Sequence, residues 1–381
     1  MTSEYRLPES ASLDILAFSR LFSDVTNSYK FLFTLALIHN LERHFYKTTR
    51  IALLDLQADM LLTAWYPHAY FKLSFGKLDK VSSVLTEVGK ELVGKRINEK
   101  DRSKLYAELK SISERSPDVF GDLLRFVPFR LIRPFFAEEV KGMKDHSVNG
   151  KVAELSETYF ASRKPLYKLS AKPTHIEIHP DWLFYIKTNA PIIKAWINWH
   201  WLKYMQHCNP SSPNVAEKLF YPEERSSLDS QSKYWRTFLT KSETTCIYSG
   251  EVLSAESISL DHYIPWSFVT HDLLWNLIPT TRTANSSKSD HLADDCYFEK
   301  FVELQHRFLT FNANALRGPE FAKLTEPYLR DLRTAETSSL LNLVHLTSAY
   351  NHNIKPIISL AIANGFAGGW QFRPPDSASL E

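Results

Sequence analysis

Apolar residues recur at intervals of three and four along most of the first 170 residues, which is the pattern of amphipathic helices. The clearest periodic segments cover residues 29–46, 51–65, 77–92 and 98–113, and few glycines or prolines interrupt them. The leucine-rich segment 51–65 is interpreted as core and not as a groove for a partner. The pattern therefore predicts a mainly α-helical domain in this part of the chain.

The pattern changes in the middle of the chain. Residues 174–178 alternate as a short strand would, and residues 180–207 form a long helical pattern whose four tryptophans we interpret as packing side chains. Residues 209–233 contain three prolines and many polar side chains, which is typical of a connector between domains. We therefore expect a helical recognition or partner-binding domain over residues 1–208 and a second domain over residues 234–381.

Two short apolar runs lie near the start of the second domain. Residues 258–260 predict a strand that delivers Asp261 and His262 at its end, and residues 276–278 predict its antiparallel partner. Gly250, which precedes both strands, indicates a tight turn at the entrance to this region. The two strands together predict a hairpin with an Asp-His pair at one end.

A helix is expected to follow the hairpin over residues 283–293, with Thr283 or Asn285 near its N-cap. Three more helical patterns come after it, at residues 297–311, 319–333 and 338–364. The second domain is therefore predicted to be a ββα unit surrounded by C-terminal helices. The fold class predicted for the whole chain is α+β, mostly α.

Composition indicates a folded protein, and the net charge limits how the chain could bind nucleic acid. The 381 residues are 44% hydrophobic and 13% aromatic, which favours a compact folded chain with a large core and more than one domain. The net charge is only +2, so binding to nucleic acid would require a local concentration of positive charge.

The clearest local positive segment covers residues 162–173. It contains Arg163, Lys164 and Lys168 and no acidic residue, so these side chains are candidates for contact with phosphate or DNA. The alternative, which is more common for a run of charges, is a solvated loop.

A second basic segment, residues 123–136, mixes three arginines with four phenylalanines. Arginine beside exposed aromatic rings can hold phosphates and stack on bases, which would indicate a nucleic-acid contact. We favour the alternative, in which the phenylalanines pack inside and the arginines extend to solvent.

The three cysteines, Cys208, Cys246 and Cys296, have no CxxC spacing, so they predict neither a disulfide framework nor a four-cysteine zinc site. This usage is typical of a reducing cytoplasm. Residues 1–10 lack the basic and apolar regions of a signal peptide. The longest apolar run, residues 31–38, is far shorter than the roughly 20 residues that cross a bilayer, so we expect a cytoplasmic protein without a membrane partner.

Asp261, His262 and Asn285 are the side chains in which hydrolytic chemistry is expected. A neutral histidine can take a proton from water near pH 7, and oxygen ligands from Asp and Asn suit Mg²⁺. Phosphodiester hydrolysis needs both a base and a cation. Because neighbouring residues on a strand point to opposite faces, Asp261 and His262 share a site only if the strand ends or bends there, which Pro265 favours.

At these residues the sequence resembles a known family. The order CIYSG, LDHYIPWSF, WNLIP and ANSSKSD across residues 246–293 is similar to the HNH (ββα-metal) nuclease domain, and in particular to the zinc-free variety in RNA-guided CRISPR effector nucleases. The alternative is a solvated strand end followed by two turn-forming asparagines. Two features depart from the family pattern: the paired CxxC zinc knuckles are absent, and the third motif residue is Asn and not His.

The resemblance implies a role for each motif residue. Asp261 and Asn285 would be ligands of Mg²⁺, with Mn²⁺ as a substitute and no structural zinc. His262 would be the general base, Asn276 would orient the loop of the active site, and Lys288 would lie near a phosphate. Asp272 in the loop is expected to be a solvated acid, with a secondary metal neighbour as the alternative. The implied substrate is DNA, with RNA as the alternative.

The whole chain also resembles standalone bacterial HNH proteins linked to phage defence, which implies a protein partner in a defence complex. A second hypothesis is a nuclease subunit that stays silent until a sensor or guide complex binds it, because the near-neutral charge provides little electrostatic attraction for DNA. A third hypothesis is a restriction or homing endonuclease, which would need base-reading elements.

Overall fold

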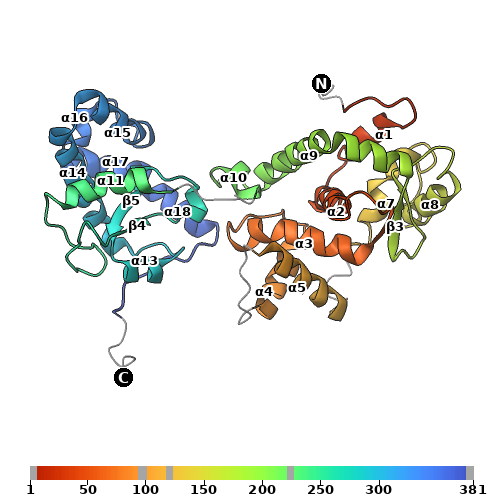
Figure 1. The fold of residues 1–381 in the computed structure, drawn as a ribbon, viewed down its shortest axis with the longest axis horizontal. Helices are drawn as coiled ribbons and strands as arrows, with labels where there is room; N and C mark the ends of the chain where they lie inside the picture. The colour runs from red at the N-terminus through yellow and green to blue at the C-terminus, as the bar shows by residue number, and fades with distance from the viewer. Residues whose placement is uncertain (1–6, 93–100, 117–122, 221–226, 375–381) are drawn as a thin grey trace. The chain divides into compact units, whose positions relative to one another are not determined.

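The structure is a computed structural model that describes residues 7–92, 101–116, 123–220 and 227–374. The chain divides into two compact units, an N-terminal unit (Met1–Pro210) and a C-terminal unit (Ser211–Glu381) (Figure 1). The division falls inside the expected connector, residues 209–233. Residues 221–226 of that connector, and residues 98–100 of an expected helix, lie outside the described residues. The predicted α+β, mostly α fold class is confirmed.

Helix α2 (Tyr29–Arg43) is the core helix of the N-terminal unit, and it packs against α3 (Leu53–Ala69) and α9 (Pro180–Cys208). Most of its residues are buried, because residues 31–38 are apolar except for Thr34. The other described helices of this unit are α1 (Ile15–Ser19), α4 (Val81–Leu92), α5 (Arg102–Arg115), α7 (Val127–Leu131), η1 (Arg133–Phe136) and α8 (Asp145–Thr158). No helix in the described ranges is long and apolar enough to span a bilayer.

A small antiparallel sheet of order β1-β3-β2 completes this unit, with β1 (Arg50–Ala52), β2 (Tyr167–Lys168) and β3 (His175–Ile178). The strand predicted at 174–178 is confirmed as β3. The helix predicted from residue 51 is wrong at its first residues, because Ile51 is buried in β1 opposite Ile176 of β3. That partner lies far away in sequence, so local periodicity does not reveal the strand.

The C-terminal unit contains a ββα arrangement made by β4 (Ser259–His262), β5 (Leu277–Thr280) and α13 (Arg282–Lys288). The strands are antiparallel, with Asp261 opposite Ile278 and His262 opposite Leu277. Asp261 and His262 are therefore the last two residues of the strand itself, which ends two residues later than the predicted end at Leu260. Gly250, with a φ of +76°, forms the predicted tight turn before the strands.

The predicted limits of the helix after the hairpin are wrong at both ends. Its N-cap is Thr281, whose side chain accepts a hydrogen bond from the Ala284 N–H, and not Thr283 or Asn285. The helix ends at Lys288, well before residue 293, because Ser289 takes a φ of +48° that an α-helix does not allow.

Helices surround the ββα arrangement and hold its loop. In the C-terminal unit these elements are α10 (Val215–Leu219), α11 (Asp229–Leu239), α12 (Trp266–Val269), η2 (Leu274–Asn276), η3 (Asp295–Tyr297), α14 (Phe298–Ala315), α15 (Gly318–Asp331), α16 (Thr337–Leu340), α17 (Leu343–Asn353) and α18 (Lys355–Ala363). Tyr263, directly after β4, stacks on Phe301 of α14 with ring centres 4.0 Å apart. The buried Gln305 of α14 donates to the backbone oxygens of Leu274 and Leu277. Helix α14 thus holds both strand ends that form the site.

Lys218 of α10 generates a prediction about pH. Its side chain is fully buried, its Nζ donates to Ser212 Oγ at 2.8 Å, and burial lowers its pKa from 10.5 to about 7. Between these two pH values the unfolded chain binds a proton that the folded chain does not, so stability rises with pH. We expect Lys218→Met to raise the unfolding temperature of the C-terminal unit more at about pH 6 than at about pH 9.

Thermal denaturation at both pH values, with the exposed Lys233→Met as the matched control, checks this expectation. An increase in unfolding temperature from Lys218→Met that is the same at both pH values would contradict it.

Candidate active site

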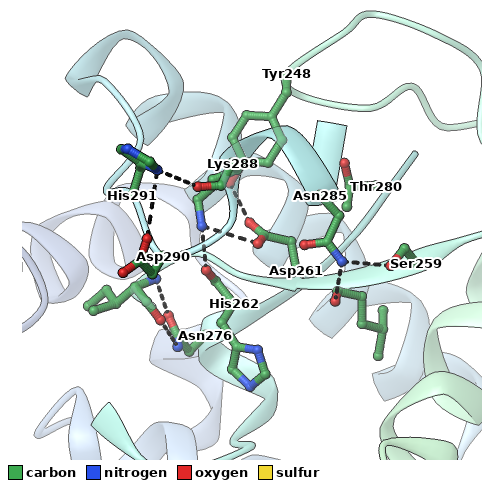
Figure 2. Close-up of polar contacts among 12 residues, drawn as sticks. Tyr248, Ser259, Asp261, His262, Asn276, Thr280, Asn285, Lys288, Asp290 and His291 are labelled. Carbon is green, nitrogen blue, oxygen red and sulfur yellow. Dashed lines mark hydrogen bonds and ion pairs between the residues drawn. The ribbon is translucent and has the colours of Figure 1, made fainter. Parts of the chain in front are cut away.

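The ββα arrangement brings five of the residues predicted from the sequence into one region (Figure 2). Strand β4 provides Asp261 and His262, and the following helix α13, which packs on β4, provides Asn285 and Lys288. Asn276 lies immediately before β5.

Asp261 is buried, with 3% of its surface exposed, and both of its carboxylate oxygens accept hydrogen bonds. Tyr248 Oη donates to Oδ2 at 2.8 Å, and Lys288 Nζ donates to Oδ1 at 3.1 Å. The fully buried Lys288 also donates to the backbone oxygen of His262 at 2.7 Å. A buried carboxylate is stable only with such partners. The position beside Asp261 therefore accommodates a positive charge.

His262 has a different partner. Its Nε2 lies 2.7 Å from Asp272 Oδ1, and Figure 2 shows its imidazole directed away from the Asp261 carboxylate. Because a carboxylate only accepts, Nε2 donates in this contact, and in the neutral imidazole the lone pair is then on Nδ1. Within the described ranges Nδ1 makes no hydrogen bond. The pair thus holds the histidine in the tautomer that a general base needs.

Asn276 closes the loop that leads from β4 to β5. Its side chain is fully buried, Oδ1 accepts from the Ile264 N–H at 2.8 Å, and Nδ2 donates to the Ile264 carbonyl at 2.9 Å. The backbone oxygen of Asn276 also accepts from the Tyr263 N–H. The loop between these residues contains Asp272, so these hydrogen bonds close the loop that carries Asp272.

Asn285 has an oriented amide. Nδ2 donates to Ser259 Oγ at 2.6 Å and to the Leu260 carbonyl at 3.2 Å. These bonds leave Oδ1 as the free end of the amide, and Figure 2 shows this oxygen on the side of Asp261. One carboxylate and one amide oxygen form a hard donor set of the kind that Mg²⁺ prefers. The described residues contain no cluster of three or more His, Cys, Asp or Glu placed to hold a metal ion.

Two other histidines, His271 and His291, lie near the site and contact a tryptophan ring and a backbone carbonyl, respectively. Burial lowers the pKa of His271 to about 4, so this side chain, beside the Trp275 ring, is neutral near pH 7. His291 is half-exposed, and its Nδ1 lies 3.0 Å from the Lys288 carbonyl at the end of α13.

The basic residues predicted between 162 and 173 belong to the N-terminal unit. Each pairs with a carboxylate from another segment: Arg163 with Glu139, Lys164 with Asp181 at 2.6 Å, and Lys168 with Glu177 at 3.2 Å. The segment has no acidic residue of its own, but the fold provides these carboxylates. Phosphate contact by these three side chains, and by Lys288, stays a prediction.

Sequence reasoning did not identify two residues of the site, Tyr248 and Asp272. Tyr248 lies in the CIYSG segment, whose tight turn at Gly250 places its hydroxyl group against Asp261. The expectation that Asp272 is a solvated acid is wrong, because its carboxylate binds His262. No spacing rule connects these two residues, since an irregular loop brings them together.

Comparison with known proteins agrees with this geometry. Residues 246–293 match the HNH endonuclease family. The resemblance to HNH nucleases is thereby confirmed for this segment, and the match indicates nuclease activity on nucleic acid, a hydrolase reaction for which HNH nucleases generally use a divalent metal ion. No curated protein and no solved structure matches the chain.

The His262–Asp272 pair predicts the effect of Asp272→Asn. A neutral amide does not stabilise the imidazolium that forms when His262 takes a proton, and its NH₂ group can favour the wrong tautomer. We expect nuclease activity to fall roughly 10–10³-fold while the fold is retained. Cleavage rates and circular dichroism check this, with the exposed Glu256→Gln as the control. Unchanged activity would show that the pair has no part in the reaction.

The buried ion pair between Asp261 and Lys288 predicts that the thermal stability of a Lys288 variant depends on divalent metal ions. Lys288→Met leaves the Asp261 carboxylate buried without a cation, which costs about 3–5 kcal/mol. A divalent ion that binds at Asp261 Oδ1 would no longer compete with the ammonium group in this variant, so Mg²⁺ or Mn²⁺ should raise its unfolding temperature more than that of the wild type. Differential scanning fluorimetry measures both shifts.

The double variant Asp261→Asn/Lys288→Met is the matched control, because it removes both charges. It should lose the metal response. Equal metal-induced shifts in the wild type and in Lys288→Met would mean that the ammonium group and the metal do not share Asp261.

Proposed function

We propose that the protein is a Mg²⁺-dependent endonuclease that hydrolyses phosphodiester bonds in DNA, with His262 as the general base. The observation that supports this most directly is the His262–Asp272 pair at the end of β4, next to the oxygen donors of Asp261 and Asn285 in an HNH domain. A base and a cation-binding position are the two components that phosphodiester hydrolysis requires.

In the proposed reaction, His262 Nδ1 takes a proton from water and the resulting hydroxide attacks phosphorus. One P–O bond forms while the P–O bond to the leaving sugar oxygen breaks. Asp272 stabilises the imidazolium that is formed, because its carboxylate accepts from Nε2–H. Asn276 keeps the Asp272 loop closed through its two hydrogen bonds to Ile264.

Asp261 and Asn285 would hold the Mg²⁺, with Mn²⁺ as a substitute. When bound, the ion would provide positive charge opposite the negative charge that grows on the phosphoryl and leaving oxygens. Two protein ligands suit Mg²⁺, which keeps several waters and takes phosphate oxygens into its shell. Lys288 would then be available to a phosphate once the metal takes over the charge of Asp261.

The proposed biological setting is cytoplasmic phage defence, which rests on the resemblance of the chain to bacterial HNH proteins. A second candidate is a subunit that a sensor or guide complex activates. The ion pairs of Arg163, Lys164 and Lys168 favour it, because they neutralise the most basic segment of the sequence in a chain whose net charge is only +2.

The test is cleavage of supercoiled plasmid by the purified full chain with Mg²⁺, with Mn²⁺ or with EDTA. We expect metal-dependent nicking, with a loss of about 10²–10⁴-fold in His262→Ala because the base is removed. His345→Ala, which changes an exposed histidine of α17, is the matched control and should cut at the wild-type rate.

Each other result would change the proposal. Cleavage of RNA but not of DNA would show that the substrate is RNA. Cleavage in EDTA would contradict the proposed dependence on a metal ion. Absence of cleavage together with weak binding to bare DNA would favour the activated-subunit candidate, whereas tight binding in moderate salt would count against it.

A further inference from the structure

The N-terminal unit contains a cavity of about 390 Å³ that lies outside the HNH domain. Its wall is formed by the end of α1, the loop that follows, the start of α2, and the α7–η1 segment. The cavity is within the size range of small-molecule sites, which are about 300–1,000 Å³. All of its lining residues belong to this one unit.

Positive charge dominates the cavity wall. Arg20, Lys30, Arg130 and Arg133 line it, together with one carboxylate, Asp24. Burial lowers the pKa of Lys30, the neighbouring Asp24 raises it, and the nearby Arg133 and Arg130 lower it further; the Lys30 Nζ donates to the Asp24 backbone oxygen at 2.7 Å. An anion between these cations would offset their mutual repulsion.

Much of this charge is not neutralised by the protein. Among the described residues, neither Arg20 nor Arg133 has a side-chain ion pair or hydrogen bond. Arg130 pairs with Asp145, but its Nε is buried without a hydrogen-bond partner. These arginines differ from Arg163 of the same unit, whose charge Glu139 neutralises.

Helix α2 adds a second source of positive potential. Tyr29 and Lys30 are its first two residues, and both line the cavity. The helix is 15 residues long, so the positive end of its dipole lies at the cavity wall. The N–H groups of Ser28 and Tyr29 at this end already donate to Asp79 Oδ2 and Asn27 Oδ1, so the helix contributes its dipole, which the Asp79 carboxylate partly offsets, and not these N–H groups.

The aromatic part of the wall is Phe126. Phe129, Phe135 and Phe136 of the same segment are buried, as the packing interpretation predicts, but Phe126 is 43% exposed. The guanidinium groups of Arg125 and Arg130 each lie 5.0 Å from the centre of its ring. An exposed ring beside guanidinium planes can stack on a nucleobase.

We propose that this cavity binds a nucleoside phosphate, with the phosphates held by Arg20, Lys30 and Arg133 and the base against Phe126. The site is independent of the nuclease chemistry, because it rests on residues of the other unit. A ligand there gives the N-terminal unit a small-molecule binding function in addition to any contact with nucleic acid.

The test is isothermal titration calorimetry of the full chain with ATP, ADP and AMP, in EDTA to exclude cleavage. Adenosine and inorganic phosphate are the reference probes. We expect at least one nucleotide to bind with a Kd below about 1 mM, and more tightly than either reference probe. In Arg20→Gln/Arg133→Gln, binding should weaken at least about tenfold, because hydrogen bonds to a charged group are lost.

The matched control is Lys141→Gln/Lys187→Gln, which removes two exposed charges outside the cavity and should bind like the wild type. A 5′-phosphorylated single-stranded oligonucleotide and its unphosphorylated form test the other source of a phosphate group. Binding of the oligonucleotide alone would overturn the proposal. So would binding of phosphate as tight as that of ATP, or nucleotide binding that the cavity variant leaves unchanged.

Discussion

The buried ion pair between Asp261 and Lys288 is the interaction on which the HNH region depends. Removing a carboxylate from water is costly unless a cation and a hydrogen-bond donor replace the lost hydration, and Lys288 and Tyr248 are those partners. The ammonium group also binds the His262 carbonyl, so it ties α13 to the end of β4. The same contacts therefore stabilise the ββα arrangement and keep a cation-binding position beside Asp261.

The geometry of β4 separates the surroundings of Asp261 from those of His262. Because Asp261 and His262 are neighbours on β4, their side chains leave the strand on different sides and need separate support. Asp261 is supported by α13 and the Tyr248 turn, and His262 by Asp272 in the loop. Asn276 holds that loop at both backbone groups of Ile264, while α14 holds the strand ends. The proposed base and the proposed metal ligands are thus positioned by independent elements.

In the N-terminal unit, the positive charges that stay without a carboxylate partner are not the ones that the linear sequence indicates. Arg163 lies in a run without acidic residues, yet Glu139 from another segment neutralises it. Arg20 and Arg133 come from separate segments, yet they meet at one cavity with few carboxylates. Local net charge is therefore a poor guide to free positive potential, because ion pairs depend on which distant segments the fold brings together.

The sequence by itself determined the helical character of the chain, the strand at residues 174–178, the ββα order and the match of residues 246–293 to HNH nucleases. These features depend on residue periodicity and on motif spacing within about 50 residues, which local physical preferences encode. Only the tertiary structure decided that Asp272 orients His262, that Tyr248 and Lys288 enclose Asp261, and that Phe126 lines a cationic cavity. Irregular loops and packing between distant segments create those contacts, and no periodic pattern records them.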